Sequence, residues 1–158
     1  MSQLPDTFFR LASERLMQYP NLAHHWSGPE SSGKRVLHLP KQDTSGFDIR
    51  IECEPYGLYP YAGDWHGATW DANAPNTTIE EQCEQCLGFV RSLLCPDSKL
   101  SVTFAGTKPI KWVLTYPIES QIQNEETGLL LFNYFVRRHT VVYQNHHLPS
   151  RASSEHAA

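Results

Sequence analysis

The sequence predicts an α+β fold, a single antiparallel β-sheet of about five to six strands packed against two helices. Two segments repeat their apolar residues at steps of three and four, which is typical of amphipathic helices. Several others alternate apolar and polar residues, as half-buried strands do. The order is helix, strands, helix, strands, without an internal repeat, and this order favours an α+β arrangement. The 158 residues suit one domain, which we place over residues 1–150, with a frayed tail at 151–158.

The first predicted helix begins at residues 4–7, with Pro5 just outside it. Its apolar stripe consists of Phe8, Leu11, Ala12, Leu16 and Tyr19. Pro20 ends it, because the residue before a proline disfavours the helical conformation. We expect residues 21–33 to form a loop.

Two strands are predicted next, at residues 34–39 and 47–54. The second alternates cleanly, with apolar residues at Phe47, Ile49, Ile51 and Cys53 and charged residues at Asp48, Arg50, Glu52 and Glu54. Such alternation predicts one buried and one solvated face. An aromatic run and an irregular loop over residues 64–76 follow.

A second helix is predicted next, capped by Thr77 or Thr78 and running to about residue 94, before Pro96. Thr78 and Glu81 have the spacing of a capping box, and Glu80 and Glu81 lie where the helix dipole favours anions. Strands are then expected at residues 100–104 and 110–116. The polar segment 117–127 reads as a loop or short helix, whereas residues 129–137 are strongly β-prone and residues 139–144 continue that strand or form another.

The charge balance bears on the class of partner. There are 13 Lys and Arg against 17 Asp and Glu, so the net charge is 13 − 17 = −4. This balance argues against a protein that holds nucleic acid by its overall charge, and it leaves a basic protein partner open. The N-terminus lacks the basic and apolar regions of a secretory signal, and no apolar run is long enough to span a membrane. We therefore expect a cytoplasmic protein without membrane contact.

The four cysteines are expected to be free thiols. Cys83 and Cys86 share a helix face with Ile79, Val90 and Leu93, which is typical of small core residues. No second ligand pair follows to complete a zinc site, so we expect neither a metal nor another cofactor.

One loop carries residues with chemical potential, namely Asp64, His66 and Asp71. Together they would suit a divalent metal or acid and base work. The alternative is structural: Trp65 and Trp70 pin the loop while its polar groups bond to the irregular backbone.

The same loop carries a family resemblance. Gly63, Trp65, His66, Trp70 and Asp71 follow a charged alternating strand and precede a helix that starts with Glu-Glu. This layout, over about residues 47–116, resembles small α+β immunity proteins of bacterial polymorphic-toxin and contact-dependent inhibition systems. The chain departs from the pattern at Ala68, where a second His is expected, and at Asp64, an extra residue. The resemblance implies a non-enzymatic cytoplasmic protein that binds and neutralises a cognate toxin domain.

Candidate residues for that partner follow from charge and from the preference of interface hot spots for aromatic residues. They are Asp48, Glu52, Glu54, Tyr56, Tyr59, Tyr61, Glu80, Glu81 and Glu84. Trp65, His66, Trp70 and Asp71 form the structural motif. Two other hypotheses stay open: a small metal-dependent or acid/base enzyme using Asp64, His66 and Asp71, and self-association through an edge strand at residues 129–136. The expected state is a monomer or weak homodimer.

Overall fold

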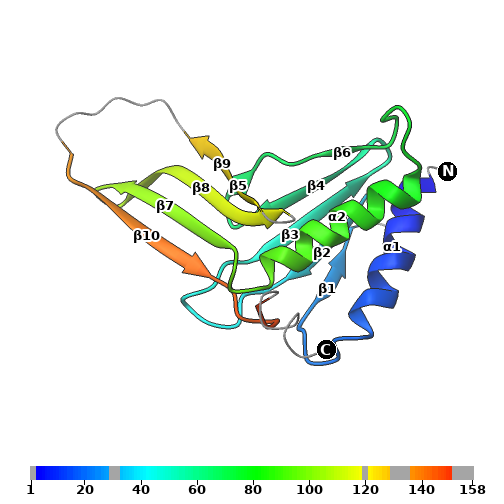
Figure 1. The fold of residues 1–158 in the computed structure, drawn as a ribbon, viewed down its shortest axis with the longest axis horizontal. Helices are drawn as coiled ribbons and strands as arrows, with labels where there is room; N and C mark the ends of the chain where they lie inside the picture. The colour runs from blue at the N-terminus through cyan, green and yellow to red at the C-terminus, as the bar shows by residue number, and fades with distance from the viewer. Residues whose placement is uncertain (1–2, 29–32, 119–120, 129–135, 151–158) are drawn as a thin grey trace. The chain divides into compact units, whose positions relative to one another are not determined.

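The structure, a computed structural model, describes residues 3–28, 33–118, 121–128 and 136–150. The first part of the chain forms α1 (Gln3–Leu16), β1 (His25–Ser27), β2 (Arg35–Leu39), β3 (Ile49–Glu54), β4 (Gly57–Ala62), β5 (Trp65–His66) and β6 (Trp70–Asp71) (Figure 1). The second part forms α2 (Ile79–Leu93), β7 (Lys99–Ala105), β8 (Lys108–Ile118), β9 (Gln121–Gly128) and β10 (Arg138–Gln144).

The α+β class is confirmed, with two helices and a six-stranded sheet, and the structure adds a second, four-stranded sheet. The first sheet has the order β1-β2-β3-β4-β5, with β6 paired to β4, and the second has the order β10-β7-β8-β9. The pairings β1–β2, β2–β3, β4–β6, β10–β7, β7–β8 and β8–β9 are antiparallel. Alternation in the sequence predicts strands but leaves their partners open, which is why the second sheet was not foreseen.

The chain divides into two compact units. The N-terminal unit comprises Met1–Pro40, Asp48–Tyr61 and Ala68–Arg91, and the C-terminal unit comprises Lys41–Phe47, Ala62–Gly67 and Ser92–Ala158. Each unit is described by itself below.

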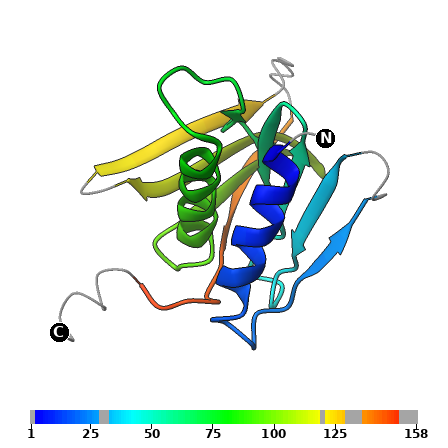
Figure 2. The ribbon, with the colours of Figure 1, turned by 90° about the vertical axis from the view of Figure 1, so that its right-hand side faces the viewer.

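The core of the N-terminal unit lies under its two helices. Its buried apolar residues include Leu4, Phe8, Ala12, Leu37, Leu39, Ile49, Ile51, Leu58 and Val90. Figure 2 shows α1 and α2 side by side, and ion pairs join them: Arg10 to Glu80 at 3.1 Å and Arg15 to Glu84 at 2.7 Å. The interior of the unit is therefore apolar, while charged pairs tie the exposed helix surfaces together.

The predicted core cysteines are confirmed, because Cys53, Cys83 and Cys86 are free and buried. Burial raises the pKa of Cys53 to about 12 and that of Cys83 to about 11. These thiols stay protonated at neutral pH, as expected of packing residues rather than nucleophiles.

Several predicted boundaries are wrong. Pro5 lies inside the first turn of α1, where the missing N–H costs nothing, and the helix ends at Leu16, before Tyr19. The predicted loop 21–33 contains β1, and the polar segment 117–127 contains most of β9. β9 is an edge strand with mostly exposed side chains. It therefore needs few apolar residues, and its sequence lacks the alternation that predicts a strand.

The other predicted strands and the second helix are confirmed. β2, β3, β7, β8 and β10 lie where the patterns placed them, and β3 buries Ile49, Ile51 and Cys53. Residues 129–135 of the β-prone run and the tail 151–158 lie outside the described residues. In the part of the chain that the structure describes, the helices lack the length and apolar character needed to cross a bilayer.

The capping box at the start of α2 is formed as predicted. The backbone N–H of Glu81 donates to the Thr78 hydroxyl at 3.2 Å, and that of Thr78 donates to the Glu81 carboxylate at 2.7 Å. These bonds lower the pKa of Glu81. We predict that Thr78→Ala lowers the free energy of unfolding by about 1 kcal/mol, measured by urea denaturation. Thr78→Ser is the control and should stay within about 0.5 kcal/mol of wild type; an equal loss in both variants would contradict a capping role.

Candidate functional site

The candidate site is the outer face of the six-stranded sheet within the N-terminal unit, on the side of β3 opposite its buried residues. The strand register places His25 opposite His38, and His38 opposite Arg50. The Arg50 guanidinium lies 4.2 Å from the centre of the Tyr61 ring. These four residues form one row across β1, β2, β3 and β4, which we call the His–Arg–Tyr row.

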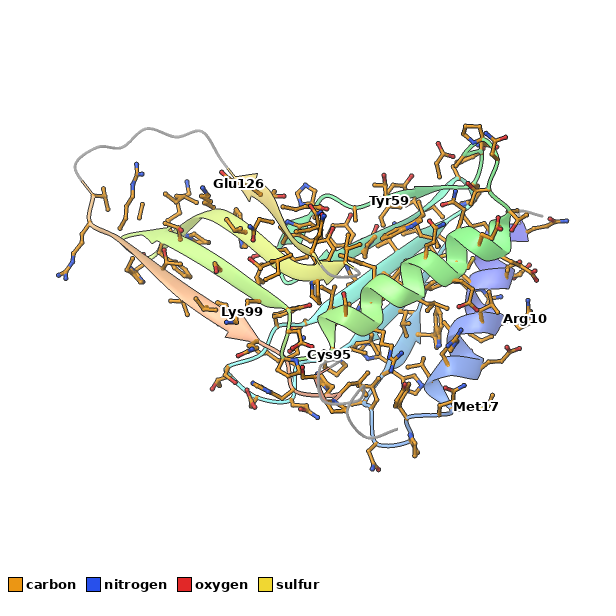
Figure 3. All side chains as sticks on the ribbon, viewed as in Figure 1. Arg10, Met17, Tyr59, Cys95, Lys99 and Glu126 are labelled. Atoms are coloured by element: carbon orange, nitrogen blue, oxygen red, sulfur yellow. The ribbon has the colours of Figure 1, made fainter. Side chains whose placement is uncertain are left out.

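A second row runs parallel to the first. Ser27 lies opposite Val36, and Val36 lies opposite Glu52. Tyr59 (labelled in Figure 3) alternates on β4 with buried Leu58 and Pro60, so it shares the outer face with Tyr61. We call the two rows, together with Lys34, Asp48 and Glu54, the sheet face.

The carboxylates of the sheet face lie among cations. The Lys34 ammonium donates to Glu52 and to Glu54, each at 2.9 Å, and Arg50 Nε lies 3.4 Å from Glu52. The bonds to Glu54 and Glu52 raise the pKa of Lys34. The predicted acidic face is thus a mixed network of charges. Such exposed pairs contribute little to stability, but they fix the directions of the side chains.

The two histidines of the row form a stacked pair. Their ring centres are 4.5 Å apart and their planes differ by 3°. The Ser27 hydroxyl lies 2.8 Å from His38 Nε2. Burial lowers the pKa of His38, and the neighbouring His25 and Arg50 lower it further, while Glu52 opposes the shift.

This arrangement predicts a pH dependence of stability. A His whose pKa is lower in the folded chain binds its proton more tightly when unfolded, so stability falls with pH below about 6.5 and is retained above it. We expect the melting temperature to drop between about pH 7.5 and about pH 5.5, and the drop to be smaller in His38→Gln. Thermal melts followed by circular dichroism measure both slopes. Equal slopes in wild type and His38→Gln would contradict the prediction.

The candidate acids on α2 have local partners. Glu80 and Glu84 pair with Arg10 and Arg15 of α1, and Glu81 belongs to the capping box. These three carboxylates therefore have structural roles. Among the candidate aromatic residues, Tyr56 is the most accessible, 72% exposed at the turn between β3 and β4.

The Trp65 segment belongs to the C-terminal unit. Trp65 is 0% exposed, and its indole N–H donates to the carbonyl of Glu125 at 3.1 Å. The exposed His66 has Nδ1 3.4 Å from the carbonyl of Asp64, and the Thr127 hydroxyl donates to the carbonyl of His66. All of these contacts involve backbone carbonyls.

Trp70 and Asp71 belong to the N-terminal unit. The Trp70 ring packs against Phe89 with centres 5.5 Å apart, and Asp71 accepts a bond from the backbone N–H of Asn73 at 2.8 Å. Over the described ranges, no group of three or more His, Cys, Asp or Glu side chains is placed to hold a metal ion.

Sequence reasoning named Tyr61 as a candidate but missed the other three residues of the His–Arg–Tyr row. His25 fell in a segment assigned to a loop, and Arg50 was named only as one of the charged residues on the solvated face of its strand. His25 lies on β1, which has only three residues and is therefore too short to show an alternation of apolar and polar residues in the sequence.

Comparison of the chain with protein-family models, with curated proteins and with solved structures gave no significant match. What the chain does is therefore inferred from its own residues.

Proposed function

We propose that this chain is a non-enzymatic, immunity-type protein of the cytoplasm that binds and neutralises a cognate bacterial toxin domain through the sheet face. The observation that carries the proposal is the His–Arg–Tyr row. Arginine and tyrosine are enriched among the residues that dominate binding energy. Arg50 and Tyr61 are held against each other before a partner arrives, which lowers the ordering cost of binding.

The charges of the sheet face suit selection of a partner. Glu52 and Glu54 are fixed by Lys34, and Asp48 lies further along the same side of the chain. A toxin domain with cations opposite these carboxylates and an acidic group opposite Arg50 fits this pattern. Complementary charge speeds association and disfavours wrong partners.

Among the described residues, the contacts of His66 and Asp71 favour a structural role over the alternative, an enzyme that uses Asp64, His66 and Asp71. His66 faces the carbonyl of Asp64, and Asp71 caps the backbone of Asn73. Both contacts join a side chain to a backbone group, as the structural interpretation of the loop predicts.

The test is co-expression with the toxin-like protein encoded beside this chain in its native source. Cells that express the toxin should survive only when this chain is present, and the purified pair should form a stable complex. Arg50→Ala and Tyr61→Ala should each weaken the complex by about tenfold or more, the range of a hot-spot residue. Calorimetry on the purified proteins measures this change.

Met17→Ala is the control, because Met17 is 73% exposed in the same unit and follows α1, on none of the four strands of the row. It should leave the affinity within about twofold of wild type. Failure of this chain to protect cells from any such neighbour would overturn the proposed function. Equal affinities for wild type, Arg50→Ala and Tyr61→Ala would overturn the proposed surface.

A further inference from the structure

In the four-stranded sheet of the C-terminal unit, β10 is an edge to which no further strand among the described residues is paired. β10 is the terminal strand in the order β10-β7-β8-β9 (Figure 1). The backbone N–H of Gln144 donates to the carbonyl of Ser45 at 2.7 Å, so it points away from β7. The direction of backbone groups alternates along a strand. Those of Arg138, Thr140 and Val142 therefore point to the same outer side.

A second hydrogen bond confirms which residues of β10 direct their backbone groups outward. The carbonyl of Arg137 accepts from the N–H of Gly106, the residue that follows β7. Odd-numbered residues of β10 thus direct their backbone groups toward β7 and even-numbered residues direct theirs outward. Within the described ranges, no acceptor lies on the outward N–H groups of Arg138, Thr140 and Val142.

The opposite edge of the sheet differs. On β9, the carbonyl of Glu125 accepts the indole N–H of Trp65, and the Thr127 hydroxyl donates to the carbonyl of His66. Two residues of β5 therefore occupy the second half of β9. On β10, Ser45 occupies only the last residue, which leaves a stretch of five residues, 138–142, for a further strand.

The chemistry of this edge is basic and apolar. Arg137 and Arg138 are exposed at the edge, and Lys108 lies on β8, two strands in from it, opposite Ala105, which itself lies opposite Arg138. Neither β7 nor β10 contains an Asp or Glu. Val142 is 54% exposed. A chain of net charge −4 thus gathers cations at one strand edge.

We infer that the β10 edge binds an acidic, extended polypeptide segment, which adds to the sheet as a fifth strand. The outward groups of Arg138, Thr140 and Val142 supply main-chain hydrogen bonds, and Arg137, Arg138 and Lys108 attract its carboxylates. In strand addition the main chain supplies affinity and the side chains supply specificity. This site shares no residue with the sheet face and does not depend on the proposed function.

A second copy of the chain fits the edge less well. Pairing β10 with itself around Thr140 would place Arg138 opposite Val142 at both ends, so that the cations would gain no opposite charge. Charge complementarity therefore favours a partner with Glu or Asp over self-pairing.

The test uses a synthetic peptide of eight residues in which Val and Thr alternate with Glu, and a second peptide in which Lys replaces Glu. Titrations followed by amide NMR should show binding of the Glu peptide only. At saturation, hydrogen exchange at Arg138, Thr140 and Val142 should slow by about tenfold or more. The Glu peptide can carry N-methyl groups on either of its two alternate sets of amides. Binding should be lost when the methylated set is the one that faces β10.

Charge reversal locates the site. Arg138→Glu should weaken binding of the Glu peptide by about tenfold. Lys99→Glu is the matched control, since Lys99 (labelled in Figure 3) lies on β7, at the other end of the strand pair. It should change the affinity by less than about twofold. Val142→Pro should abolish binding by removing an outward N–H of β10. If that variant fails to fold, the N-methylated peptide tests the reciprocal main-chain bonds, which the peptide N–H groups donate to the outward carbonyls of β10.

Four results would overturn the inference. The first is equal binding of the Lys peptide, and the second is equal weakening by Lys99→Glu and Arg138→Glu. The third is dimerisation of the chain through β10 without any peptide, seen by light scattering and lost in Val142→Pro. Binding of an oligonucleotide in place of the Glu peptide would likewise show that the cations serve phosphate and not carboxylate.

Discussion

Replacing Trp65 with Ala should lower the free energy of unfolding by about 3–5 kcal/mol, the range for removing a large buried aromatic side chain. Trp65 is fully buried, and its indole N–H satisfies the carbonyl of Glu125. The ring is also closely packed: a Cβ added at Gly67 would lie 3.1 Å from its Cζ2 atom. The protein around such a ring has little room to collapse into the vacated volume. Urea denaturation followed by circular dichroism measures the loss.

Two variants separate the contributions at this position. Trp65→Phe keeps an aromatic ring but removes the N–H that the part-buried carbonyl of Glu125 accepts, so it should lose about 1–3 kcal/mol. His66→Ala should stay within about 0.5 kcal/mol of wild type, because the His66 side chain is exposed. A loss below about 1 kcal/mol in Trp65→Ala would contradict the structural role.

The result also bears on the enzyme alternative. Thr127 and Glu125 bind the backbone carbonyl of His66 and the indole of Trp65, so β9 holds this segment independently of the imidazole. If His66→Ala left stability and toxin protection unchanged, the imidazole would have neither a structural nor a protective role.

Tyr116 of β8 supports β9 by donating a hydrogen bond to the Glu125 carboxylate. Burial and this bond raise the pKa of Tyr116.

Local patterns predicted the parts of the fold that depend on neighbours in sequence. The alternation of β3 predicted the burial of Ile49 and Ile51, and the spacing of Thr78 and Glu81 predicted the cap. In both cases the physical cause lies within a few residues of chain.

The candidate site was less predictable because its rows run across strands. His25 and His38 are 13 positions apart (38 − 25) and meet only through the register of β1 and β2. Arg50 reaches Tyr61 across a strand pair. The acids were visible in the sequence, but their partner Lys34 was not, since nothing local indicates which cation meets Glu52 and Glu54. Register depends on turns and on distant burial, which a one-dimensional pattern does not encode.

The second large effect is expected at Asn145, which is 2% exposed in the C-terminal unit. Its side-chain amide donates to the carbonyls of Phe47 and Leu93 at 3.1 and 3.2 Å, and its carbonyl accepts the N–H of Phe47 at 3.0 Å. Asn145→Ala leaves these backbone groups without partners. Each unsatisfied buried group costs about 1–3 kcal/mol, so we expect a loss of about 3–5 kcal/mol by urea denaturation.

Asn145→Asp tests the hydrogen-bond pattern with almost no change of shape. The introduced carboxylate would face two carbonyl oxygens, which raises its pKa in the folded state. Because the folded chain then binds the proton more tightly than the unfolded chain, the variant should regain stability as pH falls and lose it as pH rises through the folded pKa. Asn124→Asp, on the exposed face of β9 with one bond to Thr115, is the matched control and should show no such recovery.

A glycine beside this amide gives an independent check. A Cβ added at Gly46 would lie 2.6 Å from Asn145 Oδ1, so Gly46→Ala must displace the amide from its three backbone partners. We expect its destabilisation to approach that of Asn145→Ala, and the double variant to lose much less than the sum, because both changes break the same network. Additive losses would show that Gly46 and Asn145 act separately and that the amide does not join residues 46–47 to the end of α2.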